Sequence, residues 1–352
     1  MLARSLVKLL VQPPFHLEAT VRVLQRRPTN LIDTWEQQHY LRVIRIDGKP
    51  FLVEVENRGS IYAPDVRLSI LHAGNAAAAT ATRRREAARI TRAILGLDVD
   101  AGAAQQRAEA EAALHTTALA LDGMRPPQFP DLFETFASVI PFQQLSLEAG
   151  MAVVAKLIRR YGQALSFADR RRFAFPRADI IADSRLSGLE RCGMSRHKSH
   201  ALRTAARAIA SGALTAAAIR ELPSSAALSR LVQLPGIGPW SAALILLRGF
   251  GRVDVFPQAD SGAESSLMAL MRLRSRASLS RVVQRFGEYR GFLYFYGLGS
   301  RLLAAGLIHP ARSERNATAQ RRPVLSGKQS AATRTRARRR SNGTAHLRKT
   351  GP

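Results

Sequence analysis

The chain has 352 residues, 46% of them apolar, which is enough for two folded domains with buried cores. Lysine and arginine number 53 against 26 acidic residues, and the resulting formal net charge of +27 is typical of proteins that bind a polyanion such as nucleic acid. The single cysteine, Cys192, excludes an intrachain disulfide and the four-cysteine sites that hold zinc or an iron–sulfur cluster, and we expect it to be buried.

Two further features bear on where the chain works. The sequence has no run of about 18 apolar residues, the length that a membrane span requires, and the apolar segment near the N-terminus is too short for a secretion signal. We therefore expect a monomer without membrane contact, in the cytoplasm beside the nucleoid, or in the nucleus of a eukaryote.

The first hundred residues combine strand and helix patterns. Asp47 and Gly48 form a typical two-residue hairpin turn, because both positions of such a turn require positive φ. Strands are predicted over residues 40–46, 51–56 and 65–71, and helices over residues 17–27 and 76–95. Residues 13–115 are therefore predicted as an α+β domain, a sheet with helices against it, preceded by an extension over residues 1–12.

From residue 105 onward the apolar residues recur at helical spacing, after which Pro126, Pro127 and Pro130 mark a linker. Helices are predicted over residues 131–139, 145–161, 194–211, 225–233, 239–250, 261–272 and 290–305. Residues 116–310 are therefore predicted as an all-α domain. The fold class is mainly α, with an N-terminal α+β subdomain.

Residues 311–352 are predicted as a disordered basic tail. They carry 12 basic residues and the one acid Glu314, a net charge of +11, on a background of small polar residues that cannot build a core. The tail either adds nonspecific affinity for DNA through counterion release or has no specific role.

Residues 234–240 read LPGIGPW and join two predicted helices. Gly236 and Gly238 permit a sharp turn, and Pro239 suits the first position of the next helix. The exposed backbone N–H groups of such a turn, at the positive end of a helix dipole, can bind a phosphate oxygen without contacting a base. The alternative is an ordinary tight connection between helices.

Asp260 stands twenty residues after Trp240, just before a predicted helix. An aspartate in this place is a typical helix N-cap. The spacing also lets the helix after the hairpin run its length and return, which would bring the Asp260 carboxylate to a site that the hairpin anchors on DNA.

The stretch LVQLPGIGPWSAALILLRGFGRVDVFPQAD resembles the helix-hairpin-helix superfamily of DNA glycosylases, and within it the bacterial 3-methyladenine DNA glycosylase II group. Residues 133–162, 192–212 and 289–299 are similar to other helices of the catalytic domain in this group, and the resemblance covers roughly residues 13–308. It implies the helix-hairpin-helix glycosylase fold and double-stranded DNA with alkylated bases as the partner.

The resemblance also implies roles for individual residues. Asp260 would stabilise the oxocarbenium-like sugar and orient or deprotonate the attacking water. Trp240, where the lyases of the superfamily carry a nucleophilic lysine, would stack on the flipped base, and Gln144 would be the wedge that fills the space left by that base. The residues expected to bind the DNA backbone are Leu234, Gly236, Gly238 and Lys198.

Structural alternatives exist for these side chains. Trp240 could be a core residue that packs the hairpin, Gln144 a helix-capping or solvent-facing residue, and Lys198 part of a solvated basic face. The positions at which relatives carry Tyr, Tyr and Trp are here Leu244, Ser261 and Leu298, so the preferred base stays open. No histidine spacing indicates a metal, and no cofactor is predicted beyond a monovalent cation on the hairpin carbonyls, which the resemblance allows.

The sequence thus predicts a monofunctional glycosylase that excises bases of the 3-methyladenine and 7-methylguanine type by base flipping and hydrolysis, without strand cleavage, because position 240 holds no lysine. A non-catalytic helix-hairpin-helix protein that binds damaged DNA, or a repair regulator module, is the alternative. A glycosylase for oxidised or mismatched bases is a third hypothesis.

Overall fold

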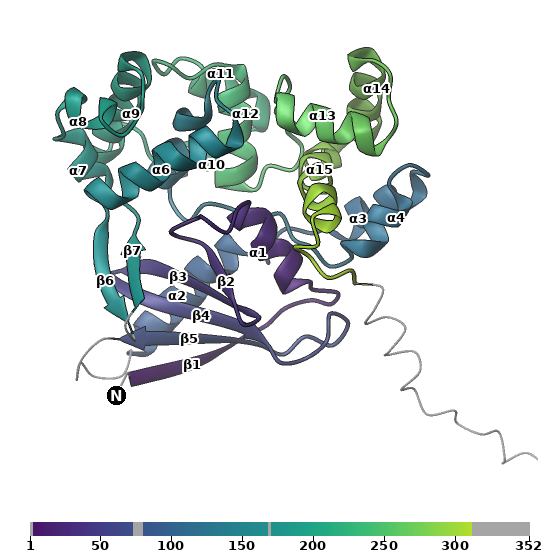
Figure 1. Ribbon diagram of the computed structural model, residues 1–352, viewed down its shortest axis with the longest axis horizontal. Helices are drawn as coiled ribbons and strands as arrows, with labels where there is room; N and C mark the ends of the chain where they lie inside the picture. The colour runs from purple at the N-terminus through teal and green to yellow at the C-terminus, as the bar shows by residue number, and fades with distance from the viewer. Residues whose placement is uncertain (1–2, 73–79, 168–169, 312–352) are drawn as a thin grey trace, which may run out of the picture. The chain divides into compact units, whose positions relative to one another are not determined.

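In the computed structural model, which describes residues 3–72, 80–167 and 170–311, five strands near the N-terminus form one antiparallel sheet in the order β1-β5-β4-β3-β2 (Figure 1). The strands are β1 (Ala3–Leu9), β2 (Thr34–Glu36), β3 (His39–Ile46), β4 (Lys49–Asn57) and β5 (Val66–His72). Asp47 and Gly48, with φ of 51° and 73°, join β3 to β4. The positive φ at both positions confirms the predicted hairpin.

Strand β1 corrects the prediction that residues 1–12 are an extension. It pairs along its whole length with β5, from Ala3 opposite His72 to Leu9 opposite Val66. Burial alternates along β1, with Val7 and Leu9 facing the core, but the exposed Leu6 hides this alternation in the sequence ARSLVKL. The tertiary pairing with β5 therefore decides this strand, which local pattern does not predict.

Helices cover one face of the sheet and a β-hairpin covers the other (Figure 1). Helices α1 (Leu17–Gln25) and α2 (Ala81–Ile94) form an apolar core with the sheet that includes Val21, Val53 and Ile90. The hairpin consists of β6 (Gln163–Phe167) and β7 (Arg170–Ala174), and it packs Phe167 against Val43.

This hairpin corrects the prediction of an all-α domain over residues 116–310. Its second strand begins with Arg170, Arg171 and Arg172, which obscure any alternation of apolar residues. Arg170 and Arg172 both form ion pairs with Glu36 on β2, at 2.5 and 2.9 Å. The hairpin is thus held by contacts with residues far away in the sequence.

The rest of the described chain is helical. Its helices are α3 (Gly102–Ala110), α4 (His115–Ala120), α5 (Leu132–Ala137), α6 (Leu147–Tyr161), α7 (Ala178–Ala182), α8 (Leu186–Glu190), α9 (Arg196–Ala210), α10 (Ala216–Arg220), α11 (Ser224–Leu231), α12 (Pro239–Phe250), α13 (Ser261–Leu270), α14 (Arg276–Phe286) and α15 (Arg290–Ala304), with the 3-10 turns η1 (Ile140–Phe142) and η2 (Gly287–Tyr289). Helix α12 has the predicted bounds, while α7, α8, α10 and α14 were not predicted.

Helix α12 lies at the centre of the largest apolar core. Every residue from Ser241 to Arg248 is buried, which explains why this segment is apolar almost throughout rather than on one face. Helix α1 contributes Ala19 and Val23 to the same core and contacts α15, so it packs against both the sheet and the helical part. Ala104, which we predicted in the N-terminal domain, also lies in this core.

A cluster of buried charged side chains links the sheet to the helices. Arg42 on β3 donates hydrogen bonds to Asp33 at 2.6 Å and to both carboxylate oxygens of Glu134 on α5 at 2.5 Å. Tyr40 donates to the same Asp33 oxygen at 2.7 Å. The cluster fixes β3 against α5.

No helix in the described parts of the chain is long and apolar enough to cross a membrane. Cys192 is buried, as predicted. The predicted basic tail lies outside the described residues, apart from Ala311.

Candidate active site

A cleft of about 1060 Å³ opens where several helices of the helical part begin. The loop between η1 and α6 forms one wall, and the first turns of α9, α12 and α13 and one side of α15 form the others. Of the residues predicted for the site, five line this cleft: Gln144, Lys198, Gly238, Trp240 and Asp260. The fold therefore brings together side chains that are up to 116 residues apart in sequence.

Asp260 uses both of its carboxylate oxygens within the protein. Oδ1 accepts a hydrogen bond from the Ala263 N–H at 2.9 Å, so Asp260 is the N-cap of α13. Oδ2 accepts one from the Trp240 indole N–H at 3.1 Å. The two donors fix the orientation of the half-buried carboxylate, and each oxygen keeps a lone pair for a water or substrate atom. Asp260 is thus both a cap and a part of the cleft.

The backbone before Asp260 is held in an unusual conformation. Ala259 has φ of 62°, a region that residues with a side chain rarely occupy. Its N–H donates to Glu264 Oε1 at 2.7 Å, and Glu264 Oε2 lies 3.3 Å from Arg276. Our sequence reasoning missed Glu264, although an acid in the first turn of a helix is a recognisable signal.

The two glycines of the hairpin between α11 and α12 differ in what they do. Gly236 has φ of 75°, and a Cβ there would lie 2.5 Å from the Cβ of Ala201, so the fold itself requires glycine. Gly238 has φ of −88°, and a Cβ there would meet nothing within 4 Å. Packing within the described chain therefore does not explain the second glycine.

The hairpin also carries open backbone donors. Among the described residues, no acceptor meets the N–H groups of Gly236 and Gly238, and Gly238 is exposed. Both groups lie at the N-terminal, positive end of the twelve-residue helix α12. Leu234 and Gly236 belong to the same turn but do not line the cleft, and the Leu234 N–H donates to Leu231 O at 3.0 Å.

Gln143 joins the hairpin to the loop before α6. Its Nε2 group donates to the carbonyl of Gly236 at 2.7 Å and to Ser241 Oγ at 2.9 Å. Lys198 Nζ donates to the carbonyl of Pro141 at 3.2 Å and to that of Gln143. Burial lowers the pKa of the Lys198 ammonium. Two of the three Lys198 donors are thus used inside the protein, which differs from the predicted contact with the DNA backbone alone.

Gln144 lies at the exposed tip of the loop before α6. Its φ of 55° turns the chain sharply, and the adjacent Leu145 is also exposed. The N-cap of α6 is Ser146, whose Oγ accepts from the Ala149 N–H at 3.2 Å. The helix-capping alternative for Gln144 is therefore wrong, and its side chain is presented to solvent at the edge of the cleft.

The side chains in the depth of the cleft include residues that we did not predict. Leu244, Ser261 and Leu298, the positions at which we expected a departure from aromatic residues, do line it. The aromatic rings that line it are those of Trp240, Phe142 and Tyr294, and the unpredicted cations are Arg26 and Arg301. Arg26 comes from the N-terminal part of the chain, and no motif in the sequence links it to the hairpin.

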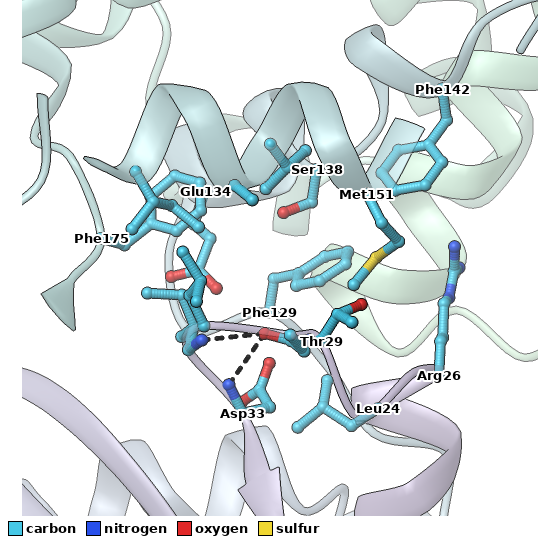
Figure 2. Close-up of a pocket in the computed structure, with 16 residues that line it drawn as sticks. Leu24, Arg26, Thr29, Asp33, Phe129, Glu134, Ser138, Phe142, Met151 and Phe175 are labelled. Carbon is cyan, nitrogen blue, oxygen red and sulfur yellow. Dashed lines mark hydrogen bonds between the residues drawn. The ribbon is translucent and has the colours of Figure 1, made fainter. Parts of the chain in front are cut away.

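A second cavity, of about 40 Å³, lies between the N-terminal part and helices α5 and α6 (Figure 2). Asn30 Oδ1 accepts hydrogen bonds there from the N–H groups of Ile32 and Asp33 at 2.9 and 3.0 Å, and Arg26 and Phe142 line both cavities. A cavity of this size holds about three water molecules and no nucleobase. The larger cleft is therefore the candidate active site.

In residues 3–72, 80–167 and 170–311, no cluster of three or more His, Cys, Asp or Glu side chains could hold a metal ion. The hairpin carbonyls of Leu234 and Gly236 both accept hydrogen bonds within the protein, from the Ile237 N–H and from Gln143. The monovalent cation on the hairpin stays a prediction.

Two family models match the chain. Residues 6–131 match the AlkA N-terminal domain, and residues 137–288 match the HhH-GPD superfamily base excision DNA repair protein. The second match contains η1, the hairpin, Trp240 and Asp260.

Relatives in sequence carry names that agree with these matches. The chain is 24% identical to the DNA-3-methyladenine glycosylase of Bacillus subtilis over 217 residues, which are 61% of this chain and 72% of that protein. It is 25% identical to the DNA-3-methyladenine glycosylase 2 of Escherichia coli over 283 residues, which are 80% of this chain and 92% of that protein.

Solved structures share the fold. A 3-methyladenine DNA-glycosylase from Archaeoglobus fulgidus superimposes with a TM-score of 0.68 at 22% identity, covering 85% of this chain and 98% of that one. The 8-oxoguanine glycosylase/lyase of Clostridium acetobutylicum, in complex with double-stranded DNA, gives a TM-score of 0.64 at 18% identity, covering 85% of this chain and 97% of that one. The shared fold therefore spans the described sheet and helices together.

Proposed function

Because the chain belongs to the HhH-GPD superfamily of base excision DNA repair proteins, we propose that it is a monofunctional DNA glycosylase that removes alkylated bases from double-stranded DNA. The observation that carries this proposal is the hydrogen bond between Trp240 and Asp260 in a cleft beside the hairpin. The cap of α13 uses only Oδ1 of Asp260, so capping does not account for the second oxygen, which the Trp240 N–H orients.

Binding would begin at the hairpin. The open N–H groups of Gly236 and Gly238 would donate to a phosphate oxygen, and the absence of a Cβ at Gly238 would let the DNA backbone approach closely. This contact reads no base, which suits an enzyme that must find damage in any sequence. The positive net charge of the chain adds affinity for the duplex.

The target nucleotide would then leave the base stack, because the glycosidic bond is out of reach inside a duplex. Gln144, exposed at the tip of its loop, would enter the space that the base leaves. The flipped base would enter the cleft beside the Trp240 ring. Gln143 and Lys198 would act as positioning residues, since they hold the wedge loop against the hairpin.

Hydrolysis would follow at C1′ of the flipped nucleotide. The bond between C1′ and the base nitrogen breaks, and the base leaves with the electron pair. The negative charge of Asp260 stabilises the cationic sugar. A water oxygen adds to C1′ and loses a proton, which the Asp260 carboxylate accepts and passes to solvent, while the departing base takes up a proton where its chemistry requires one. The products are a free base and an abasic site.

Strand cleavage would require a nucleophilic amine, and the cleft offers none in place. Trp240 occupies the position that a lysine would need, and its indole N–H is bonded to Asp260. Among the described residues that line the cleft, the only lysine is Lys198, whose ammonium is bonded to two carbonyls.

The proposal is tested by incubating the protein with methylated duplex DNA and identifying the released bases by mass spectrometry. We expect free methylated purines and an uncleaved strand. Binding of damaged DNA without base release would favour the non-catalytic alternative. A covalent adduct after borohydride reduction, or release of 8-oxoguanine instead of alkylated bases, would favour a lyase for oxidised bases.

A further inference from the structure

Arg26 reaches the candidate active site from the other end of the sequence. It is the C-cap of α1, and Figure 2 shows its side chain extending toward Phe142. Its Nη2 group donates a hydrogen bond to the Tyr294 hydroxyl at 2.5 Å, and its guanidinium carbon lies 5.6 Å from the centre of the Phe142 ring. Arg26, Phe142 and Tyr294 all line the cleft that contains Asp260.

The backbone at Arg26 is strained. Its φ of 61° and ψ of −42° place it at the centre of a tight turn, in which the Arg27 N–H donates to Gln25 O at 2.7 Å. A residue with a side chain rarely adopts this conformation, and such residues persist where the surrounding structure holds them. The strain places the Arg26 side chain on the side of the cleft, while Arg27 turns to the surface and pairs with Glu148 at 2.7 Å.

The positive charge of Arg26 is not compensated by an acid. Within the described chain no carboxylate forms an ion pair with it, and only its Nη2 group donates a hydrogen bond. Its other N–H groups are not among the buried polar groups that lack a partner, so they are open to the cavities that Arg26 lines. Arg26 therefore offers a positive potential and open hydrogen-bond donors to a base that enters the cleft.

The aromatic rings that line the cleft also bear on which bases it accepts. Phenylalanine and tyrosine rings attract cations through their faces. Arg26 lies over the face of the Phe142 ring, so this ring already holds a cation of the protein. Tyr294 contacts Arg26 through its hydroxyl, and its side chain is buried. Leu244, Ser261 and Leu298 contribute no ring at all. Trp240 is left as the ring for a base.

We propose that Arg26 is a specificity-determining residue, which favours neutral modified bases with an acceptor edge over cationic N-alkylated purines. The inference rests on the proposed glycosylase function and deepens it by choosing a substrate class. A neutral adduct such as 1,N6-ethenoadenine presents ring nitrogens that accept from the Arg26 donors. A 7-methylguanine carries a positive charge in DNA, which Arg26 repels.

The test compares two duplexes, one with 1,N6-ethenoadenine and one with 7-methylguanine, by single-turnover excision. It also uses the same two lesions on 2′-fluoroarabino sugars, which resist cleavage, to measure Kd. We expect Arg26→Gln to shift both ratios toward 7-methylguanine by about tenfold, because one unit charge is lost near the base. Arg26→Lys keeps the charge and should retain the wild-type ratios within about threefold.

Arg159→Gln is the matched control, because it removes an equal charge from an exposed residue of α6 that does not line the cleft. It should leave the ratios unchanged. If Arg26→Gln lowers the excision rate and the affinity equally for both lesions, the proposal is overturned, and Arg26 is only a structural link to Tyr294. Equal weakening of undamaged DNA with a smaller salt dependence would also overturn it, since that result identifies a phosphate contact. If the wild type excises neither lesion, the glycosylase function fails, and the Kd ratios alone decide the role of Arg26.

Discussion

The Trp240 indole and the Asp260 carboxylate form the pair on which the proposed chemistry depends. The ring lines the cleft, while its N–H orients one carboxylate oxygen. The other oxygen caps α13, which confirms the N-cap interpretation of Asp260, while its catalytic role stays a prediction. The structural and the proposed catalytic role use different atoms of one side chain.

Replacing Trp240 by phenylalanine separates the ring from its N–H. We expect Trp240→Phe to lower the single-turnover excision rate by about fivefold, because Asp260 loses a donor worth about 1 kcal/mol. The Kd for DNA should change little, since the hairpin is intact. An unchanged rate would show that the hydrogen bond does not position the carboxylate.

The two hairpin glycines give a prediction at the scale of the element. Gly236→Ala should destabilise the protein by about 1–3 kcal/mol, because the alanine would carry positive φ and lie against Ala201. Gly238→Ala should retain stability, since no protein atom opposes it, and should weaken DNA binding. Denaturant unfolding and Kd measurement on both variants check this. Equal stability losses would contradict the assignment of Gly238 to DNA.

The buried cluster of Arg42, Asp33 and Glu134, which joins β3 to α5, gives a second prediction at this scale. Arg42→Met would leave the buried side chains of Asp33 and Glu134 without their hydrogen-bond donor and cation, so we expect it to lower the free energy of unfolding by about 3–5 kcal/mol. Urea unfolding measures this directly. Replacement of Arg45, which is half exposed on the same strand, provides the control and should cost much less. A loss below about 1 kcal/mol for Arg42→Met would show that the cluster does not hold β3 to α5.

The extent of prediction from sequence differed between elements. The hairpin between α11 and α12 and helix α12 itself were both predicted. They follow from local signals, which are two glycines, a proline and an apolar run. Strands β1 and β7 were missed because their stability comes from partners such as β5 and Glu36, which lie elsewhere in the chain. Arg26 and Tyr294 were missed for the same reason, since they are 268 residues apart and meet only in the folded cleft.

At the scale of the whole molecule, Glu134 makes folding stability depend on pH. Burial, together with repulsion from the carboxylates of Asp131 and Asp33, raises the pKa of Glu134 from 4.5 to about 8, although Arg42 lowers it. The folded state then binds this proton more tightly than the unfolded state. The free energy of unfolding is greatest while the proton is bound. It falls as pH rises from 4.5 to about 8, by up to about 1.4 kcal/mol per pH unit.

We therefore expect the free energy of unfolding to be lower at pH 7.5 than at pH 6 by about 2 kcal/mol from this group. Glu134→Gln should remove that part of the pH dependence, because its amide does not titrate. Urea unfolding of both proteins at the two pH values gives the comparison. Identical slopes for wild type and Glu134→Gln would contradict the raised pKa.

The central claim is that one folded chain uses the Asp260 carboxylate to release an alkylated base without cutting the strand. Asp260→Asn tests it most directly, because asparagine also caps helices, so the fold should survive while the charge is lost. The measurement is the single-turnover release of methylated purines by wild type and variant, beside their thermal unfolding. We predict a loss of at least about a hundredfold in release with nearly unchanged unfolding. Equal release by the two proteins would contradict the account.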